Sequence, residues 1–497
     1  MATAATRPTF AKPASHTVQH DAAALVVLAI VVVAVRMPWL GHPVATADEQ
    51  LYSLIGNALA GGTLPYGELW DRKPFGLFAL FGLAHAVAGP SPAAYQVLAA
   101  IFTLAGAWLT MLLARPLVDR ATAAGAGVLY VLLMGVYGSH SGQSETFHVP
   151  MILLSALLLR DPLHPRALGR ACAAMLIGGV ALQVKYTVLP QCLVLGGWFL
   201  WNRHKAGDSG PKLIMLAALS AALGILPTVL AGTGFAVAGQ WDAFAHANFL
   251  SFFDRAPADA GRLHADLAVQ FLPLALLASC GVYAALRLNP PRDLPYYRFI
   301  LLLLGGATAT AFLPGTVYAY YFAAAVPACV LAALPLLDRT APSRWVPLAV
   351  FIAALAWMQL QPSKWEERAA DSGAFDRLTA AISPLVNAED ECLWIHDGPA
   401  ALYRATGSCF PTRFIYPDHL NNLLERDALG VSQTGEVRRI LLESPPVIVT
   451  AASALTPQNE QVRRQVMEKI AASYEPIARE TVQDREYTAW GLRTATD

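Results

Sequence analysis

Apolar runs of about twenty residues recur from residue 21 to residue 360, and they restrict the fold more than any other feature of the chain. A helix of about that length crosses a hydrocarbon core of about 30 Å. Charged residues make up only 14% of the sequence, against about 25% in soluble domains, so much of the surface faces something other than water. Because the chain lacks the short alternating segments of a membrane barrel, we predict an all-α polytopic membrane domain.

Windows of about nineteen residues place about eleven transmembrane helices in residues 22–360. The predicted spans are 22–40, 93–114, 122–138, 147–160, 170–184, 186–202, 212–236, 267–287, 299–314, 320–337 and 346–360. If residues 1–21 form a cytoplasmic tail, most loop Lys and Arg residues fall on the cytoplasmic side, as the positive-inside rule expects.

The apolar stretch 75–89 is short for a span, and counting it as one would put the basic loops outside. We interpret it as a re-entrant or interfacial helix within the first outer loop, residues 41–92. A short tilted span is the alternative.

An odd number of spans places residues 361–497 outside, where charged residues become frequent. Helical patterns at 373–386, 418–429, 437–443 and 460–472 alternate with strand-like runs at 392–396, 446–450 and 487–492. This alternation predicts a small C-terminal α/β extracytoplasmic domain. Its two cysteines, Cys392 and Cys409, could form a disulfide there, but their spacing does not establish the geometry.

Two adjacent carboxylates, Asp48 and Glu49, follow the first span. Their mutual repulsion at a membrane boundary raises the pKa of at least one of them. Such a carboxylate suits a general base that activates a hydroxyl nucleophile. The alternative is an acidic pair that opens an interfacial helix and is stabilised there by the helix dipole.

Arg72 and Lys73 lie farther along the same loop, on the side that otherwise carries few cations. Lys as a point charge and Arg as a fork could hold a phosphate. The alternative is structural: Tyr66 anchors the loop at the headgroup level, and the two cations pair with neighbouring carboxylates such as Asp71.

Glu145 in the second outer loop and Lys185 between two weakly predicted spans each need a partner, a cavity or water. They could pair, although nothing in the sequence brings them together.

His140 and His148 match no closed metal site, so the need for a divalent metal stays open. Phosphate-loop, hydrolase, metalloprotease and dinucleotide motifs are absent. Any transfer therefore needs an activated donor, such as a lipid-linked phosphosugar. The zero formal charge argues against nucleic acid.

The first outer loop resembles that of the GT-C membrane glycosyltransferases. The closest branch contains the protein O-mannosyltransferases and the aminoarabinose and galacturonic acid transferases of lipopolysaccharide. The resemblance is carried mainly by Asp48-Glu49, Tyr52, Pro65-Tyr66 and the run 70–74, Trp-Asp-Arg-Lys-Pro. It continues through Glu145 and Lys185.

The resemblance implies an enzyme of the cytoplasmic (inner) membrane that uses a polyprenyl-phosphate sugar and inverts the anomeric centre at the outer face. Asp48 would be the catalytic base. The substrate-binding residues would be Glu49, Tyr52, Tyr66, Asp71, Arg72, Lys73, Glu145 and Lys185, with Lys73 near the donor phosphate. Two departures stand out: Phe75 replaces the second proline of the Lys-Pro-Pro motif, and Tyr320-Tyr321 replaces a common His-Tyr pair. The second puts a histidine-dependent metal contact in doubt.

We therefore expect a glycosyltransferase that acts on a glycan, lipid or protein acceptor. A transporter or flippase of a lipid-linked or small substrate is the alternative, and a membrane scaffold is a third reading. The charged candidates cluster on the outer side, and we find no internal repeat, whereas transporters place their sites near mid-membrane between repeats. The sugar, the acceptor and the oligomeric state stay open.

Overall fold

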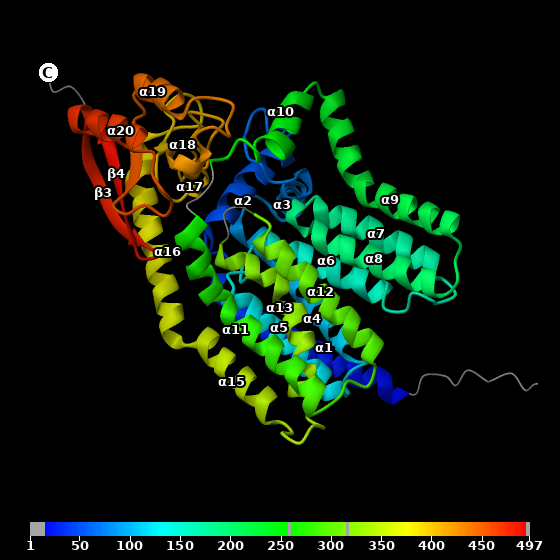
Figure 1. The fold of residues 1–497 in the computed structure, drawn as a ribbon. Coiled ribbons are helices and arrows are strands. Elements are labelled where there is room, and N and C mark those ends of the chain that lie inside the picture. Colours follow the sequence, from blue (N-terminus) through cyan, green and yellow to red (C-terminus); the bar gives the residue numbers. More distant parts are fainter. Residues whose placement is uncertain (1–14, 257–259, 315–317, 494–497) are drawn as a thin grey trace, which may run out of the picture.

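The computed structural model describes residues 15–256, 260–314 and 318–493. Residues 1–14 of the predicted cytoplasmic tail lie outside this part of the chain, and the rest of that tail belongs to the first helix. A body of helices carries a smaller domain with a sheet at one end (Figure 1). The predicted fold class, an all-α membrane domain followed by a small α/β domain, is confirmed.

Ten of the predicted spans coincide with a helix. These are α1 (Ser15–Arg36), α4 (Pro92–Ala114), α5 (Arg120–Val136), α6 (Ser144–Leu158), α7 (Ala167–Leu182), α8 (Leu189–Lys205), α9 (Gly210–Val237), α11 (Ala260–Arg287), α12 (Leu294–Phe312) and α15 (Val346–Leu360). The predicted span 320–337 is instead divided into η4 (Ala319–Ala325), α13 (Val326–Ala332) and α14 (Leu334–Leu337). Pro327 and Pro335 lie in the first turns of the last two segments, because proline lacks the N–H that a helix interior requires.

Within the described residues, five helical segments are long and apolar enough to cross a membrane. They are Asp21–Trp39, Pro92–Ala114, Gly210–Val237, Leu267–Arg287 and Val346–Leu385. Several of the other predicted spans form shorter apolar helices. The chain is a multi-pass membrane protein; the number of spans and their orientation stay predictions.

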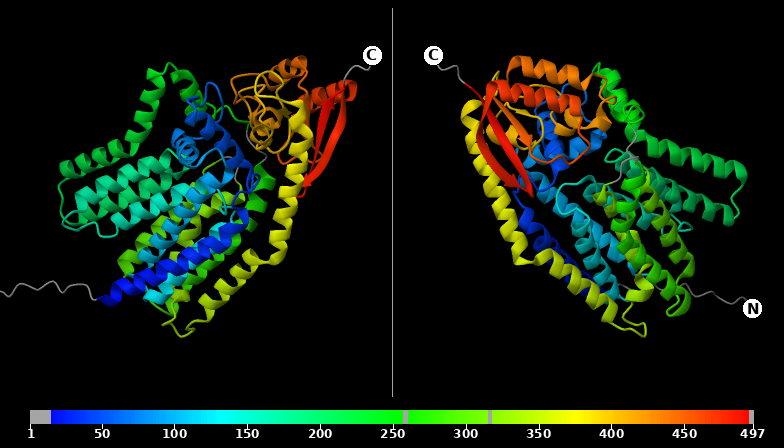
Figure 2. Two further views of the ribbon diagram at one scale, coloured as in Figure 1. Left: turned by 180° about the vertical axis from the view of Figure 1, so that it is seen from behind. Right: turned by 60° about the vertical axis from the view of Figure 1, so that its left-hand side comes forward.

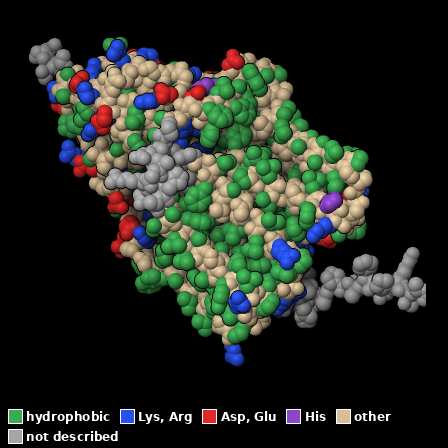
Figure 3. All heavy atoms as spheres, in the orientation of Figure 1, with side chains coloured by type: hydrophobic (Ala, Val, Ile, Leu, Met, Phe, Trp, Pro, Cys, Tyr) green, Lys and Arg blue, Asp and Glu red, His purple; other side chains and the backbone are tan. Residues whose placement is uncertain are grey.

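The helices α1, α4, α5, α11 and α12 run side by side through the body, and α7, α8 and α9 form a layer beside them (Figures 1 and 2). From α15, the chain bends into the long helix α16 (Pro362–Ile382), which rises along the edge of the body to the smaller domain. On the face shown in Figure 3, hydrophobic side chains cover much of the helical body, and charged side chains gather over the smaller domain and at the opposite end.

Between the body and the smaller domain lie α2 (Ala47–Ala60) and α3 (Phe75–Ala88), which form a tightly packed pair. A Cβ atom added at Gly56 would lie 2.5 Å from the Cβ of Phe81 and 2.8 Å from the amide nitrogen of Gly82. The 14 residues of α3 rise about 21 Å, which is less than a hydrocarbon core. Its length fits the re-entrant or interfacial helix expected at 75–89, and its membrane placement stays a prediction.

The smaller domain, here called the outer domain, has a four-stranded sheet in the order β1-β2-β4-β3. The strands are β1 (Trp394–Ile395), β2 (Val447–Ala451), β3 (Tyr474–Val482) and β4 (Arg485–Leu492). Strands β1 and β2 are parallel, and the other pairs are antiparallel. Helices α16, α17 (Leu402–Thr406), α18 (Pro417–Asn421), α19 (Gln433–Glu443) and α20 (Glu460–Ser473) complete the domain.

Two expectations for this domain are wrong in detail. The sequence patterns do not predict strand β3, which is an edge strand with several charged residues. The hairpin turn that follows it has Gln483 and Asp484 at positive φ and contains no glycine. The helix expected at 418–429 is only α18 followed by the single turn η6 (Leu423–Glu425). Asn422 divides the two segments because its side chain accepts a hydrogen bond from the amide of Leu424.

The outer domain is fixed directly to the α2–α3 pair. Arg404 donates two hydrogen bonds of 2.7 Å to Ser53 on α2, one to the hydroxyl and one to the carbonyl oxygen. The amide of Ala401 donates to Gln50 at 3.0 Å. One hydrophobic cluster includes Leu54 and Phe78 from the pair together with apolar residues of the outer domain. A disulfide between Cys392 and Cys409 closes a loop within the domain.

The contact at Gly56 leads to a stability prediction. We expect Gly56→Ala to lower the free energy of unfolding by about 1–3 kcal/mol, because the new methyl group overpacks the backbone of α3. The matched control is Gly197→Ala in α8, where nothing lies within 4 Å of the added Cβ. Thermal unfolding in lipid nanodiscs measures both variants. Equal melting temperatures for the two would contradict the tight α2–α3 contact.

Candidate active site

A cavity of about 470 Å³ lies where the outer domain meets the helical body. The first two outer loops and the start of α2 form part of its wall, through residues 46–48, 71–73 and several of 138–143. The rest of the wall includes residues from 318–321, before α13, and from 416–425 of the outer domain. A larger hollow of about 570 Å³, beside Arg115 and Arg160, contains none of the predicted site residues. The predicted site residues therefore point to the first cavity.

Asp48 lies in the first turn of α2, where the helix dipole stabilises a carboxylate. Three tyrosine hydroxyls donate hydrogen bonds to it. Tyr52, one turn further along α2, and Tyr320, from η4, each reach Oδ2 at 3.0 Å. Tyr416 of the outer domain reaches Oδ1 at 3.2 Å. Because Oδ2 already has two donors, Oδ1 is the oxygen with more room for another hydroxyl.

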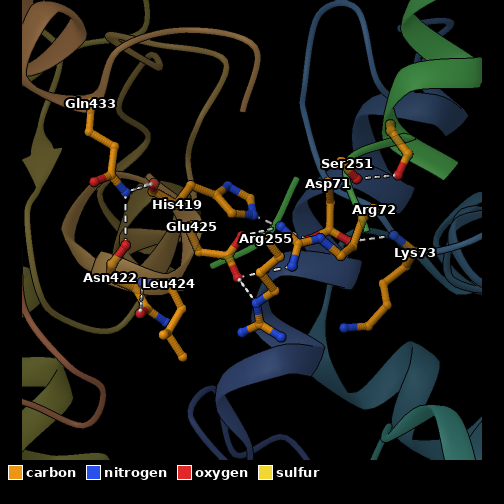
Figure 4. A network of polar contacts seen from close by, with 11 residues as sticks. Asp71, Arg72, Lys73, Ser251, Arg255, His419, Asn422, Leu424, Glu425 and Gln433 are labelled. Carbon is orange, nitrogen blue, oxygen red and sulfur yellow. Dashed lines mark hydrogen bonds and ion pairs between the residues drawn. The ribbon is translucent and has the colours of Figure 1, made fainter. Parts of the chain in front are cut away.

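Glu425 and two arginines form an ion-pair cluster in the wall of the same cavity (Figure 4). Arg72 forms a bidentate pair with Glu425, and Nε of Arg255 lies 2.9 Å from Oε1 of the same carboxylate. Burial alone would raise the pKa of Glu425, but the two guanidinium groups outweigh burial and lower it. The carboxylate of Glu425 is therefore ionised and holds both cations at the cavity.

Lys73 is the third cation of the cavity. Among the described residues, its ammonium group has no ion-pair or hydrogen-bond partner, and Figure 4 shows it apart from the Glu425 cluster. The ammonium lies 5.5 Å from the ring centre of Tyr52. Burial would lower the pKa of Lys73, but the charges of Asp48 and Asp71 outweigh burial and raise it. Lys73 thus carries a positive charge available to an anionic ligand.

Asp71 links the first outer loop to the outer domain. Its Oδ1 accepts a 2.7 Å hydrogen bond from the amide of Lys73, and its Oδ2 lies 3.3 Å from Nε2 of His419. Burial would raise the pKa of Asp71, but the His419 hydrogen bond and the charge of Lys73 together lower it. Gln433 holds the chain beyond His419 through bonds to the carbonyls of His419 and Asn422 (Figure 4).

Five predicted site residues lie outside the cavity lining, and one of them is Tyr52, which contacts Asp48. Tyr66 is fully buried, and its hydroxyl donates to the carbonyl of Lys73 at 3.0 Å. Glu49 is also fully buried and accepts hydrogen bonds from the amide of Gly142 and the hydroxyl of Tyr95. Glu145 and Lys185 form a buried ion pair, which the sequence left open.

The Glu145–Lys185 pair lies behind the cavity wall. The ammonium of Lys185 lies 3.6 Å from the ring centre of Tyr321, which lines the cavity. Of the predicted residues, the cavity lining thus includes Asp48, Asp71, Arg72 and Lys73, and Tyr52 contacts Asp48.

Sequence reasoning missed a second set of lining residues, namely Arg255, Tyr416, Asp418, His419 and Glu425. The sequence does offer a reason to suspect Arg255, because it is one of the few cations on the predicted outer side. The other four belong to the outer domain, and no local pattern marks them. Within the part of the chain that the structure describes, no group of three or more His, Cys, Asp or Glu side chains is placed to hold a metal.

The buried Glu145–Lys185 pair leads to a double-mutant prediction. Glu145→Gln or Lys185→Met alone leaves one charge buried without its partner, and should cost about 3–5 kcal/mol of stability. The double variant should lose less than the sum of the two. Thermal unfolding in nanodiscs measures the three variants. Additive losses would show that the two charges are not coupled.

Comparison with known proteins agrees with this fold. Residues 72–227 match the family model described as dolichyl-phosphate-mannose-protein mannosyltransferase. No curated protein matches the sequence significantly. The crystal structure of ArnT from Cupriavidus metallidurans bound to undecaprenyl phosphate superimposes with a TM-score of 0.62 at 16% identity, covering 96% of this chain and 98% of that one. The apo state of ArnT also gives a TM-score of 0.62 at 16% identity, covering 95% and 97% of the two chains.

The family match and the fold point to the same group of proteins. The family match includes Arg72, Lys73, Glu145 and Lys185, whereas the structural match covers nearly the whole chain. The predicted resemblance is confirmed: the chain has the GT-C fold of ArnT, and its residues 72–227 match the mannosyltransferase family model.

Proposed function

We propose that this protein transfers a sugar from a polyprenyl-phosphate donor to an acceptor hydroxyl, with Asp48 as the catalytic base. The observation that carries the proposal is the shared cavity. It holds a carboxylate positioned by three tyrosines together with the cations Arg72, Lys73 and Arg255. A base and a phosphate-binding group in one cavity are the two requirements of glycosyl transfer from a lipid phosphate.

The acceptor hydroxyl would approach Oδ1 of Asp48, where only Tyr416 now donates. Asp48 takes the hydroxyl proton while the acceptor oxygen bonds to the anomeric carbon of the sugar. The bond from that carbon to the phosphate oxygen breaks, and its electron pair leaves with the lipid phosphate. Attack opposite the leaving group inverts the anomeric centre.

Lys73 is best placed to neutralise the departing phosphate, because its ammonium has no ion-pair partner within the described residues. Arg72 and Arg255 already share Glu425, so they add positive potential while their positions stay fixed. A fixed charge stabilises a transition state without reorganisation at the moment of reaction. The undecaprenyl phosphate bound to ArnT, a protein of the same fold, supports a polyprenyl phosphate as the ligand class.

The remaining predicted residues would hold the base, the cations and the loops of the cavity in position. Tyr66 holds the Lys73 carbonyl, Glu49 holds the second outer loop, and Lys185 packs on Tyr321. We also propose that the protein lies in the cytoplasmic membrane with its N-terminus inside, so that the cavity and the outer domain face outward. The distribution of loop cations supports this orientation.

Substitution of the base tests the mechanism. Asp48→Asn should reduce sugar transfer by about 10²–10⁴-fold, the usual contribution of a positioned general base. The control is Asp242→Asn, since Asp242 is an exposed carboxylate outside the cavity lining. The measurement is mass spectrometry of envelope glycans from a deletion strain that carries each variant at equal membrane levels.

Three results are informative. Loss of one sugar unit on deletion, restored by the wild type and by Asp242→Asn but not by Asp48→Asn, supports the proposal. Restoration by Asp48→Asn would show that Asp48 is not the base. If deletion leaves the glycan profile unchanged, the glycosyl-transfer proposal fails, and the transporter becomes the favoured reading.

Binding of the lipid phosphate tests the role of Lys73. Lys73→Gln should weaken binding of decaprenyl phosphate about tenfold to a hundredfold, the range for a lost hydrogen bond to a charged group. Lys469→Gln, on α20 of the outer domain, is the control. Calorimetry in nanodiscs measures both. Wild-type affinity in Lys73→Gln would place the phosphate elsewhere.

A further inference from the structure

Asp418 is a carboxyl group of the cavity wall that the proposed reaction has not used. It lies in α18 of the outer domain, and the hydroxyl of Thr456 donates a 3.1 Å hydrogen bond to its Oδ1. Thr456 lines the same cavity. No other hydrogen bond to this carboxyl group occurs among the described residues, so it retains acceptor capacity toward the cavity.

In the sequence, Asp418 lies between a residue that contacts the proposed base and a residue that holds two of the cavity's cations. Tyr416, two residues earlier, contacts the base Asp48. Glu425, seven residues later, holds the cations Arg72 and Arg255. In the proposed reaction, the donor sugar lies between the base, which takes the acceptor proton, and the cations, which hold the phosphate. Asp418 lines the same cavity, so a sugar bound there would lie within the reach of its carboxyl group.

Three other side chains that line this cavity each have a buried polar atom without a hydrogen-bond partner among the described residues. Gln143 is only 4% exposed, and its side-chain oxygen has no hydrogen bond within residues 15–256, 260–314 and 318–493. The same holds for the hydroxyl of Thr46 and for Nδ1 of His419, and all three side chains line the cavity. Buried polar groups are normally satisfied, so this set is suited to a ligand with several hydroxyl groups.

We propose that Asp418, held by Thr456, is a sugar-binding residue that accepts hydrogen bonds from hydroxyls of the donor sugar and selects against sugars that carry a carboxylate. This inference rests on the proposed function, and it narrows the substrate class of the same site. The donor would be a polyprenyl phosphate that carries a neutral sugar rather than a uronic acid.

The charges around Asp418 explain the selection. Burial raises its pKa to about 6, and the negative charges of Asp397, Glu425 and Asp48 add to this effect. Asp397 pairs with Arg485 at 2.9 Å, and Glu425 pairs with its two arginines. The other ionisable groups that line the cavity within the described residues are the carboxylate of Asp71, the ammonium of Lys73, the imidazoles of His140 and His419, and the phenols of Tyr318, Tyr320, Tyr321 and Tyr416.

The pH dependence follows from this pKa. At pH 7.5, above the raised pKa, Asp418 is ionised, accepts charge-assisted hydrogen bonds from hydroxyls and repels a uronate. At pH 5.0 it is mostly protonated, and the repulsion weakens. A sugar phosphodiester and a uronate both stay ionised across this range, since a sugar carboxyl has an ordinary pKa of about 4. Preference for the neutral sugar should therefore decrease as the pH falls through about 6.

The test compares matched donor lipids on the full-length protein in nanodiscs. The probes are decaprenyl phosphate without a sugar, and decaprenyl-phosphate glucose, mannose and galactose, each beside its own uronic acid. Calorimetry at pH 7.5 and 5.0 gives the dissociation constants. The variants are Asp418→Asn and Asp418→Ala. Asp427→Asn is the matched control, because Asp427 is an exposed carboxylate of the same domain.

We expect the wild type and Asp427→Asn to prefer one neutral-sugar lipid over its uronic acid by at least tenfold at pH 7.5, and by less at pH 5.0. Both Asp418 variants should bind that neutral-sugar lipid about tenfold to a hundredfold more weakly. In Asp418→Asn, the preference over the uronic acid should be smaller and independent of pH. Unchanged binding of sugar-free decaprenyl phosphate shows that the variants are folded.

Other results overturn one proposal or the other. If Asp418→Asn keeps the wild-type preference and its pH dependence, Asp418 does not select the sugar. If a uronic acid lipid binds the wild type more tightly than its neutral counterpart, the inferred substrate class is wrong. If decaprenyl phosphate and all its sugars fail to bind the wild type, the proposed function fails, and the inference fails with it.

Discussion

The carboxylate of Asp48 is the point at which three distant parts of the chain meet. Its hydrogen bonds come from α2, from η4 some 272 residues later, and from the outer domain some 368 residues later. A partly buried carboxylate benefits from such donors, because they replace the water that it has lost. The outer domain is therefore part of the site, since Tyr416 satisfies a group that the helical body cannot satisfy alone.

Two other buried carboxylates of the cavity, Glu425 and Asp71, follow the same rule. Glu425 of the outer domain satisfies two arginines of the helical body, and His419 satisfies Asp71 of the first outer loop. Each pair crosses the boundary between the two units. Removing one member of a buried pair is strongly destabilising, because the other charge stays without compensation. The boundary contacts thus fix the outer domain over α2 and α3, and they keep the cavity at one defined geometry.

The sequence predicts the features that are local along the chain. Apolar runs mark the helices of the body, and the cluster of Asp71, Arg72 and Lys73 marks one wall of the cavity. Asp418 and Glu425 carry no such mark, because only tertiary folding brings them beside residues more than 300 positions away. Strand β3 was missed for a related reason: its charged residues suit a sheet edge, and its hairpin turn lacks the glycine that usually signals one.

The distribution of charge in the cavity also constrains the reaction. Arg72 and Arg255 are already neutralised in part by Glu425, whereas Lys73 has no ion-pair partner among the residues that the structure describes. A cation without an ion-pair partner suits the single negative charge of a phosphodiester, which is the form of a lipid-linked sugar. Transfer releases a phosphate monoester, which carries a second charge near neutral pH. Arg72 and Arg255, held in place by Glu425, add positive potential that stabilises this second charge without reorganisation. The cavity therefore matches the phosphate product better than Lys73 alone would.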